Sequence, residues 1–262
     1  MSYLTRFDQK PSIKLNSPLQ LADSTSEFRW RDIRALNINY RNGDIKMFGE
    51  LQVISFNTSL PSYISDVLVK ELAEAGKREK VIDNFVNFLL GILKFNEYPF
   101  KLKLKADCYF QVDDKVVTSE TNFSIWKNKL YVIVNEDKHI HNVSNHTGWG
   151  ECQIAGELLA SAYINHREIA ERYAVQTIFA IRVIGTRFTF YRAEVKSSYL
   201  NSLSEGFSDK NLSIYRYPAL NDKYPNRIPC LDYTDPNQRE QILEIMIKIK
   251  NFVIQNKTIR YN

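Results

Sequence analysis

The stretch 116–138 constrains the fold more than any other part of the sequence, because it has the pattern of a β-hairpin with charged residues at its open end. Two apolar runs, 123–126 and 130–134, are rich in β-branched and aromatic residues and flank the polar segment 127–129. Apolar runs on either side of a short polar turn are typical of paired antiparallel strands. We therefore expect a hairpin at the centre of the fold.

The register of this hairpin decides which charged residues meet. If Asn128 is the midpoint of the turn, Glu120 lies opposite Glu136. Side chains alternate along a strand, so Lys138 shares this face and Asp137 points to the other. A two-residue turn would instead shift the pairing by one and place Asp137 on the face of Glu120.

Glu120, Glu136 and Lys138 together have the chemistry of a metal and phosphate site. Two close carboxylates repel each other unless a cation lies between them, and Mg²⁺ prefers such oxygens together with water and substrate phosphate. A lysine beside them can hold a phosphate oxygen, stabilise developing charge or orient an attacking water. The alternative is a hairpin edge in water, with the lysine paired to the two acids for structural reasons.

The composition predicts a folded chain and says little about its partner. With 262 residues, 44% of them hydrophobic and 13% aromatic, the chain can bury a full core and is most simply one elaborated domain. The 35 basic and 30 acidic residues leave a net charge of +5. This charge is compatible with a phosphate-bearing partner and too small to require one.

Cysteine usage and hydropathy predict an intracellular protein, cytoplasmic or nuclear. The cysteines Cys108, Cys152 and Cys230 are far apart and odd in number, which favours a reducing compartment over a disulfide scaffold. The first residues lack the apolar core of a secretory signal. No stretch approaches the roughly 18 apolar residues of a membrane span. We therefore expect no membrane association.

Helices and strands alternate in the rest of the sequence. Residues 1–28 predict an extended arm or a loosely packed lead-in, and a short strand is expected within 49–56. Apolar periodicity then predicts, in chain order, helices over 64–75 and 77–95, a strand over 100–112, the hairpin, a helix over 151–164, and strands over 175–183 and 187–195. Asp235 before Pro236, with Gln238 two residues further on, indicates the start of a C-terminal helix.

The motif E-x-K at the end of a hydrophobic strand, with an acid across a hairpin and a helix after it, resembles the PD-(D/E)XK nuclease superfamily. The helix-strand-strand-strand-helix-strand core of that superfamily is similar to the order expected here. By this resemblance Glu120 holds the first acid position, Glu136 the second and Lys138 the lysine. The implied fold class is α/β, with a restriction-endonuclease-like core, a mixed central β-sheet flanked by helices, and N- and C-terminal elaborations.

The segments ECQIAGELLASA and RVIGTRFTFYRAEV resemble more particularly a fungal and Crinkler-related branch, with its Q-x-x-x-E helix and G-T-x-x-x-F-Y strand pair. Gln153 and Glu157 are four residues apart and so lie on one helical face. Glu79 resembles the helix acid that some branches add to the metal site, with Asp83 as the competitor. The resemblance covers about half of the chain.

This resemblance implies a Mg²⁺-dependent nuclease, with Mn²⁺ as an alternative ion and DNA favoured over RNA as the partner. The metal ligands would be Glu79, Glu120 and Glu136, and Lys138 would position the attacking water, with Gln153 at the same site. The implied organisation is an N-terminal elaboration over 1–60, a nuclease core over 61–200 and a C-terminal extension over 201–262. The oligomeric state is left open, with a homodimer among the options.

Two departures from the motif favour a second hypothesis. Thr118 and Ser119 stand where the name-giving proline would be, and Glu120 replaces the commoner aspartate. A degenerate member that binds nucleic acid or protein without cleavage is therefore the first alternative.

Three further patterns suggest other sites. Cys152 beside the histidines suggests a thiol hydrolase, although helix-borne cysteines are usually buried. His139, His141 and His146 suggest a transition-metal site, although a polar loop explains them as well. The interleaved tyrosines and arginines of 215–227 suggest base stacking or aromatic packing over the core.

Overall fold

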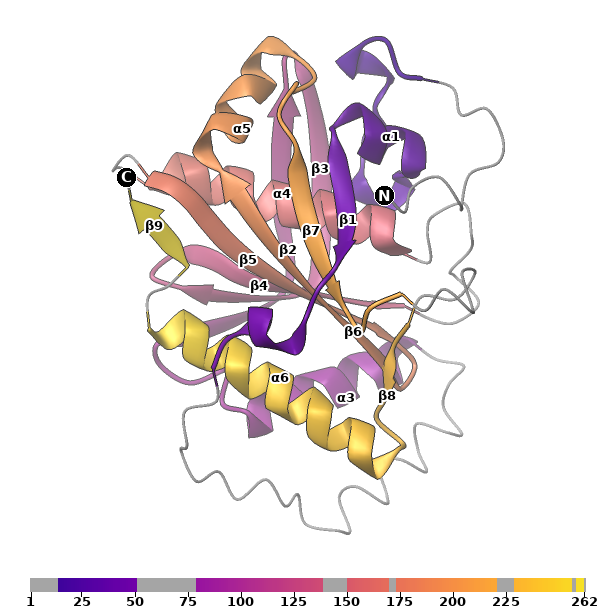
Figure 1. Cartoon of the computed structure of the whole chain (residues 1–262), viewed down its shortest axis with the longest axis vertical. Coiled ribbons are helices and arrows are strands. Elements are labelled where there is room, and N and C mark those ends of the chain that lie inside the picture. Colours follow the sequence, from indigo (N-terminus) through magenta and orange to yellow (C-terminus); the bar gives the residue numbers. More distant parts are fainter. Residues whose placement is uncertain are drawn as a thin grey trace.

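The computed structural model describes residues 14–50, 79–138, 150–169, 173–220, 229–255 and 258–261, with the backbone alone described for 79–81 and 134–138. Within these residues the chain forms an α/β fold with one nine-stranded mixed sheet (Figure 1). The predicted fold class is confirmed at this level. No helix in these ranges is long and apolar enough to cross a membrane.

The elements follow the order expected for the central part of the chain. The strands are β1 (Ile38–Asn42), β2 (Phe100–Val112), β3 (Lys115–Lys127), β4 (Leu130–Lys138), β5 (Tyr173–Ile184), β6 (Arg187–Lys196), β7 (Leu212–Tyr217), β8 (Leu231–Asp232) and β9 (Ile259–Tyr261). The helices are α1 (Trp30–Ala35), α3 (Glu79–Ile92), α4 (Glu151–Glu168), α5 (Ser197–Ser202) and α6 (Pro236–Ile254). The predicted order of helix, three strands, helix and two strands is therefore confirmed from α3 to β6. The helix expected over 64–75 lies outside the described residues.

The sheet has the strand order β1-β7-β6-β5-β4-β3-β2, with β8 paired to β6 and β9 to β5. The strands β2, β3 and β4 form an antiparallel meander. The chain then crosses through α4 and returns as β5, which is parallel to β4. This crossover places the end of β4 and the beginning of α4 at the same edge of the sheet.

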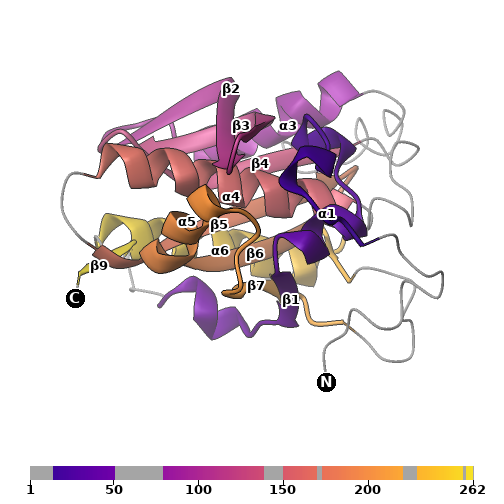
Figure 2. The same cartoon turned by 90° about the horizontal axis from the view of Figure 1, so that it is seen from above.

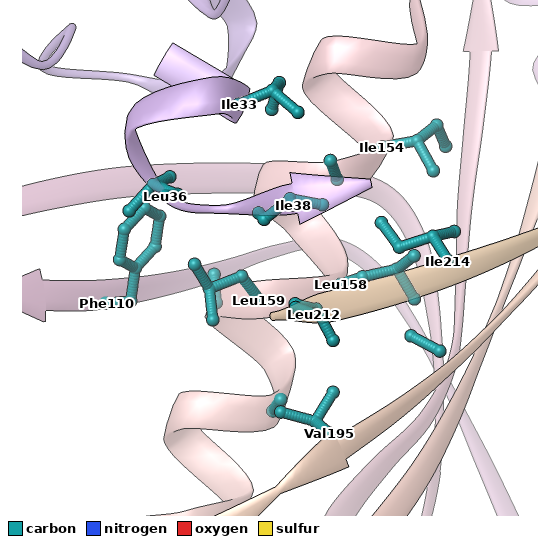
Figure 3. Close-up of a cluster of buried hydrophobic side chains, with 14 of the residues drawn as sticks. Ile33, Leu36, Ile38, Phe110, Ile154, Leu158, Leu159, Val195, Leu212 and Ile214 are labelled. Carbon is teal, nitrogen blue, oxygen red and sulfur yellow. The ribbon is translucent and has the colours of Figure 1, made fainter. Parts of the chain in front are cut away.

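Helices cover both faces of the sheet. Figures 1 and 2 show α1, α4 and α5 on one face and α6 on the other. The first face has a buried core, which we call the α4 core, around Phe110, Leu158, Leu159, Val195 and Ile214 (Figure 3). The opposite core, which we call the α6 core, contains residues of α3 and α6 together with the strand residues whose side chains are buried on that face of the sheet. Strands covered on both faces are long apolar runs, as the sequence of β5 shows.

The C-terminal helix begins as its sequence predicts. Asp235 is the N-cap, and its side chain accepts hydrogen bonds from the backbone N–H groups of Asn237 and Gln238 at 2.9 and 3.2 Å. These bonds satisfy donors that no helical carbonyl can reach. Apolar residues spaced along the helix, from Ile242 to Val253, are buried in the α6 core.

The N-terminal segment differs from its prediction as an extended arm or a loosely packed lead-in. Over the described residues 14–28 it forms two 3₁₀ turns, Pro18–Gln20 and Thr25–Glu27, and buries Leu15, Leu21 and Phe28. The segment then continues through α1 into β1, which pairs in parallel with β7. The prediction was wrong here because isolated apolar residues among polar ones show no periodicity, although they still fill a core.

The N-terminal segment and α4 pack against each other at Gly156. A Cβ atom built there would lie 2.5 Å from Thr25 Cγ2 and 3.2 Å from Phe28 Cδ2. Thr25 cannot move freely, because its hydroxyl donates a hydrogen bond to Ser119 Oγ at 2.8 Å. A glycine is therefore required in the middle of α4 for close packing.

We predict that Gly156→Ala destabilises the protein, although alanine is the better helix former. Overpacking costs about 1–3 kcal/mol, which exceeds the gain of about 0.5–1 kcal/mol in helix propensity. Gly91→Ala in α3 is the matched control, because the nearest atom to a Cβ there is 4.0 Å away. The control should be neutral or stabilising in urea unfolding. Equal effects at the two glycines would contradict this packing argument.

Candidate functional site

The candidate site lies where the end of β4 meets the first half of α4. This half of the helix is buried on all sides, between the sheet and the N-terminal segment. Its polar residues Glu151, Gln153 and Glu157 are buried with the rest, with exposed fractions of 1%, 7% and 0%. Buried polar and charged groups are normally paired or hydrogen-bonded, so we identify the partners of each of the three.

Glu151 in the first turn of α4 forms a buried ion pair with Arg216 of β7. The guanidinium donates from Nε and Nη2 to the two carboxylate oxygens, the latter at 2.5 Å. Tyr191 Oη of β6 donates to Glu151 Oε1 at 3.0 Å, and Tyr40 Oη of β1 donates to the Glu151 carbonyl at 2.6 Å. Three strands therefore hold the beginning of α4.

The charges of this pair stabilise each other in a dry environment. Burial by itself lowers the pKa of Arg216, but the charge and hydrogen bond of Glu151, together with Tyr191 and Tyr40, outweigh it and hold the pKa above its ordinary value. Burial raises the pKa of the Tyr40 and Tyr191 hydroxyls, and Glu151 raises it further, so both remain hydrogen-bond donors. Sequence reasoning missed this network, because neither an acid in a first helical turn nor an arginine in a strand is distinctive.

Gln153 and Glu157 lie on one face of α4, as their spacing predicts. Gln153 Nε2 donates to Glu157 Oε1 at 2.8 Å, and both side chains are buried. Burial, chiefly, raises the pKa of the Cys108 thiol of β2 to about 12. Glu157 lies close enough to this thiol to raise its pKa as well. The pair therefore faces the sheet over the β2–β4 meander, and not solvent.

Backbone pairing places the end of β4 beside β5. Glu136 is the register partner of Arg182, and Lys138 that of Ile184. Arg182 is 2% exposed, and its Nη2 donates to Thr189 Oγ1 at 3.0 Å. The neighbours of Arg182 in β5, Ile181 and Val183, belong to the α6 core, so Arg182 lies on the α4 side.

Arg182 also marks the contact between this strand and the start of α4. Its Cδ lies 3.6 Å from the position of a Cβ at Gly150, and its guanidinium carbon lies 5.9 Å from the centre of the Tyr191 ring. Arg182 is not among the residues predicted from the sequence to form the site. An arginine inside a long apolar run was the available signal, because a buried arginine is rare without partners.

The predicted pairing of Glu120 with Glu136 is wrong. The turn has two residues, Asn128 and Lys129, both with positive φ, and one extra residue in β4 forms a bulge beyond it. In the resulting register the described pairs of β3 with β4 end at Phe123 and Asn135. On the other side of β3, Glu120 is the partner of Asp107 of β2. The two-residue turn shifts the pairing by one, as considered above, and the bulge shifts it again.

Glu120 is exposed and points away from α4. Its neighbour Ser119 is buried against Thr25, on the α4 side of the sheet. Val117 lies in the α4 core whereas Phe123 lies in the α6 core, so β3 changes face between them. At the same level β2 contains Lys105, whose φ is 45°. The described pairing of β3 with β4 does not include Glu120.

The two candidate acids of α3 lie in a helix on the other side of the sheet from Gln153. Glu79 is the first residue of α3, and its side chain lies outside the described residues. Asp83 is half-buried, and its Oδ1 atom is buried without a hydrogen-bond partner in the described part of the chain. Because α3 packs in the α6 core, neither acid shares the face of α4.

The described residues give no geometric support to a thiol hydrolase site at Cys152 or to a histidine metal site. Cys152 is fully buried, and burial raises the pKa of its thiol well above the ordinary value, which opposes formation of a thiolate. His166 on α4 contacts Tyr173 Oη at 2.9 Å and Asn201 Oδ1 at 2.8 Å. His139, His141 and His146 lie outside the described residues.

Comparisons with known proteins leave the site to be interpreted from its own chemistry. No protein-family model matches this sequence, and no curated protein matches it. Among the residues whose side chains are described, no three acidic, histidine or cysteine side chains gather as a metal-binding cluster.

We predict that the Glu151–Arg216 pair dominates the stability of this region. Glu151→Gln or Arg216→Gln should each cost about 3–5 kcal/mol, because each leaves one buried charge uncompensated. The double variant Glu151→Leu/Arg216→Met should lose less than either single change. Denaturant unfolding of the three variants measures this coupling.

The control for this prediction is Glu97→Gln, in an ion pair with Lys94 whose side chains are more than half exposed. Exposed pairs of this kind contribute at most about 1 kcal/mol. A loss at Glu151 no larger than that at Glu97 would show that the buried pair does not hold α4 in place.

Proposed function

We propose that this chain is a Mg²⁺-dependent nuclease whose site is formed by Glu136 and Lys138 of β4 together with Gln153 and Glu157 of α4. The observation that carries the proposal is the buried carboxamide–carboxylate pair Gln153–Glu157, which faces the sheet at the crossover from β4 to α4. The order of elements from α3 to β5 supports it, because it is the order of the nuclease superfamily that the sequence resembles.

The donor set fits a hard cation. Glu136 and Glu157 would supply carboxylate oxygens and Gln153 an amide oxygen, and Mg²⁺ takes such ligands together with water. When bound, the ion would supply positive charge at the phosphate and lower the pKa of a water ligand. Mn²⁺ has the same preference for oxygen ligands.

The protein's own groups would have separate roles in hydrolysis. The ammonium group of Lys138 would offset the negative charge that develops on the phosphate oxygens. Gln153 would orient the Glu157 carboxylate through the hydrogen bond between them. Arg182, the register partner of Glu136, would keep that position electropositive. DNA is proposed ahead of RNA on the resemblance alone, and Glu120 has no role in this version of the site.

The alternative is a nuclease-fold module that binds nucleic acid or protein without cleaving. The outward position of Glu120 favours it, because the first acid of the resembled motif then faces away from α4. The two hypotheses differ in their dependence on divalent metal, since only hydrolysis requires it.

Hydrolysis of single- and double-stranded DNA and of RNA, with Mg²⁺, Mn²⁺ or EDTA, tests the proposal. We predict metal-dependent cleavage that falls by about 10²–10³-fold in Glu136→Gln and in Lys138→Ala, because each change removes charge stabilisation of the transition state. Glu157→Gln should also reduce the rate. Glu120→Gln is the matched control, an acid exposed on β3, and should leave the rate unchanged.

Each alternative predicts a different result. Loss of cleavage in Glu120→Gln equal to that in Glu136→Gln would show that the site uses the hairpin acids after all. Binding of nucleic acid that is indifferent to metal, without cleavage of any substrate, would support the binding module instead. Circular dichroism of each variant separates these outcomes from unfolding.

A further inference from the structure

A second candidate site is a pocket of about 630 Å³ beside α1. Its wall combines the cationic side chains of Lys14, Arg31 and Arg34 with the apolar side chains of Leu15 and Phe207. Among the described residues that line it, none is acidic. The volume is in the range of small-molecule sites, and the lining suits an anion that carries an apolar group.

The two arginines are presented by a helix whose position is fixed. Arg31 and Arg34 are three residues apart in α1 and lie on one face of it. The other face is buried through Asp32 and Ile33. The Asp32 carboxylate accepts hydrogen bonds from the backbone N–H groups of Arg29 at 2.9 Å and Ala22 at 3.3 Å. The contacts of the buried face therefore fix the position of α1 and of the pocket side of the helix without a ligand.

Arg31 forms a long ion pair with Asp32, and 38% of its side chain is exposed. Its Nε atom is buried and has no hydrogen-bond partner in the described part of the chain. The ion pair joins this Nε to Asp32 Oδ2 over 3.7 Å, and that oxygen already accepts the hydrogen bond from the backbone N–H of Arg29. The exposed part of the Arg31 side chain can therefore donate charged hydrogen bonds to a phosphate.

The apolar part of the wall distinguishes a nucleotide from a bare phosphate. Phe207 is half-buried and packs against the α4 core, and Leu15 is 5% exposed. An aromatic ring next to guanidinium groups is the usual surface on which proteins stack nucleobases. Inorganic phosphate would use only the cationic part of the pocket.

We propose that this pocket is a second ligand site that binds a nucleotide through its phosphate. Arg31 and Arg34 hold the phosphate oxygens, Lys14 adds positive charge, and Phe207 stacks on the base. A free nucleoside monophosphate and the 5′-phosphorylated end of a strand offer the same chemistry. The proposal does not depend on the hydrolytic site at β4.

Calorimetric titration of the full chain in EDTA tests this proposal. We expect AMP to bind about ten times more tightly than inorganic phosphate, because only AMP can stack on Phe207. The double variant R31Q/R34Q should weaken AMP binding about tenfold or more through loss of charged hydrogen bonds. Arg41→Gln removes the same charge from an exposed residue of β1 outside the pocket and should leave binding unchanged.

Binding of oligonucleotides with a 5′-phosphate or a 5′-hydroxyl end shows whether the pocket takes a strand end or a free nucleotide. Tighter binding of the phosphorylated oligonucleotide indicates a strand end, and binding of AMP alone indicates a free nucleotide. Phe207→Leu should reduce the preference for AMP over inorganic phosphate. If R31Q/R34Q fails to fold, Phe207→Leu and Lys14→Gln test in its place whether AMP binds in this pocket.

Absence of AMP binding to the unmodified chain, or unchanged binding in R31Q/R34Q, overturns the proposal. Because no divalent ion is present in these titrations, their outcome is separate from that of the hydrolysis experiments.

Discussion

The buried ion pair between Glu151 and Arg216 is the interaction on which the arrangement of this protein depends. It joins the first turn of α4 to β7, and the hydroxyls of Tyr40 and Tyr191 extend the contact to β1 and β6. In the sequence β1 precedes α4 by more than 100 residues, whereas β6 and β7 follow it. One desolvated network therefore aligns the half of the sheet formed by β1, β6 and β7 with the crossover that contains the candidate site.

This arrangement packs α4 on several sides instead of one. Gln153 and Glu157 lie on the side that faces the sheet, and Glu151 in the first turn pairs with Arg216. On the outer side Thr25 packs against Gly156. A helix buried all round lacks the single apolar stripe of a surface helix, so its polar residues are the exceptions that a function can explain. The N-terminal segment that covers α4 also forms the cationic pocket beside α1.

The hairpin shows why the fold was easier to predict than the site. The strand β2 has the bounds that its alternating pattern predicts, and Asp235 caps α6 as expected. The positions of Glu120 and Glu136 depended on a turn of two residues, a bulge in β4 and a change of face in β3. Each of these shifts register or face by a single residue, while the hydrophobic pattern that identifies the strands stays the same.

The sequence by itself determined the α/β class, the order of elements from α3 to β6 and the shared helical face of Gln153 and Glu157, because periodicity and capping are local properties. Only the tertiary structure decided that Glu120 is exposed and that Arg182 and Arg216 are buried. Only the tertiary structure, too, decided that residues 14–50 form part of the sheet and of the α4 core. These outcomes depend on which distant segments desolvate one another, and the free energy of that burial is set by the packed neighbours and not by the residue type.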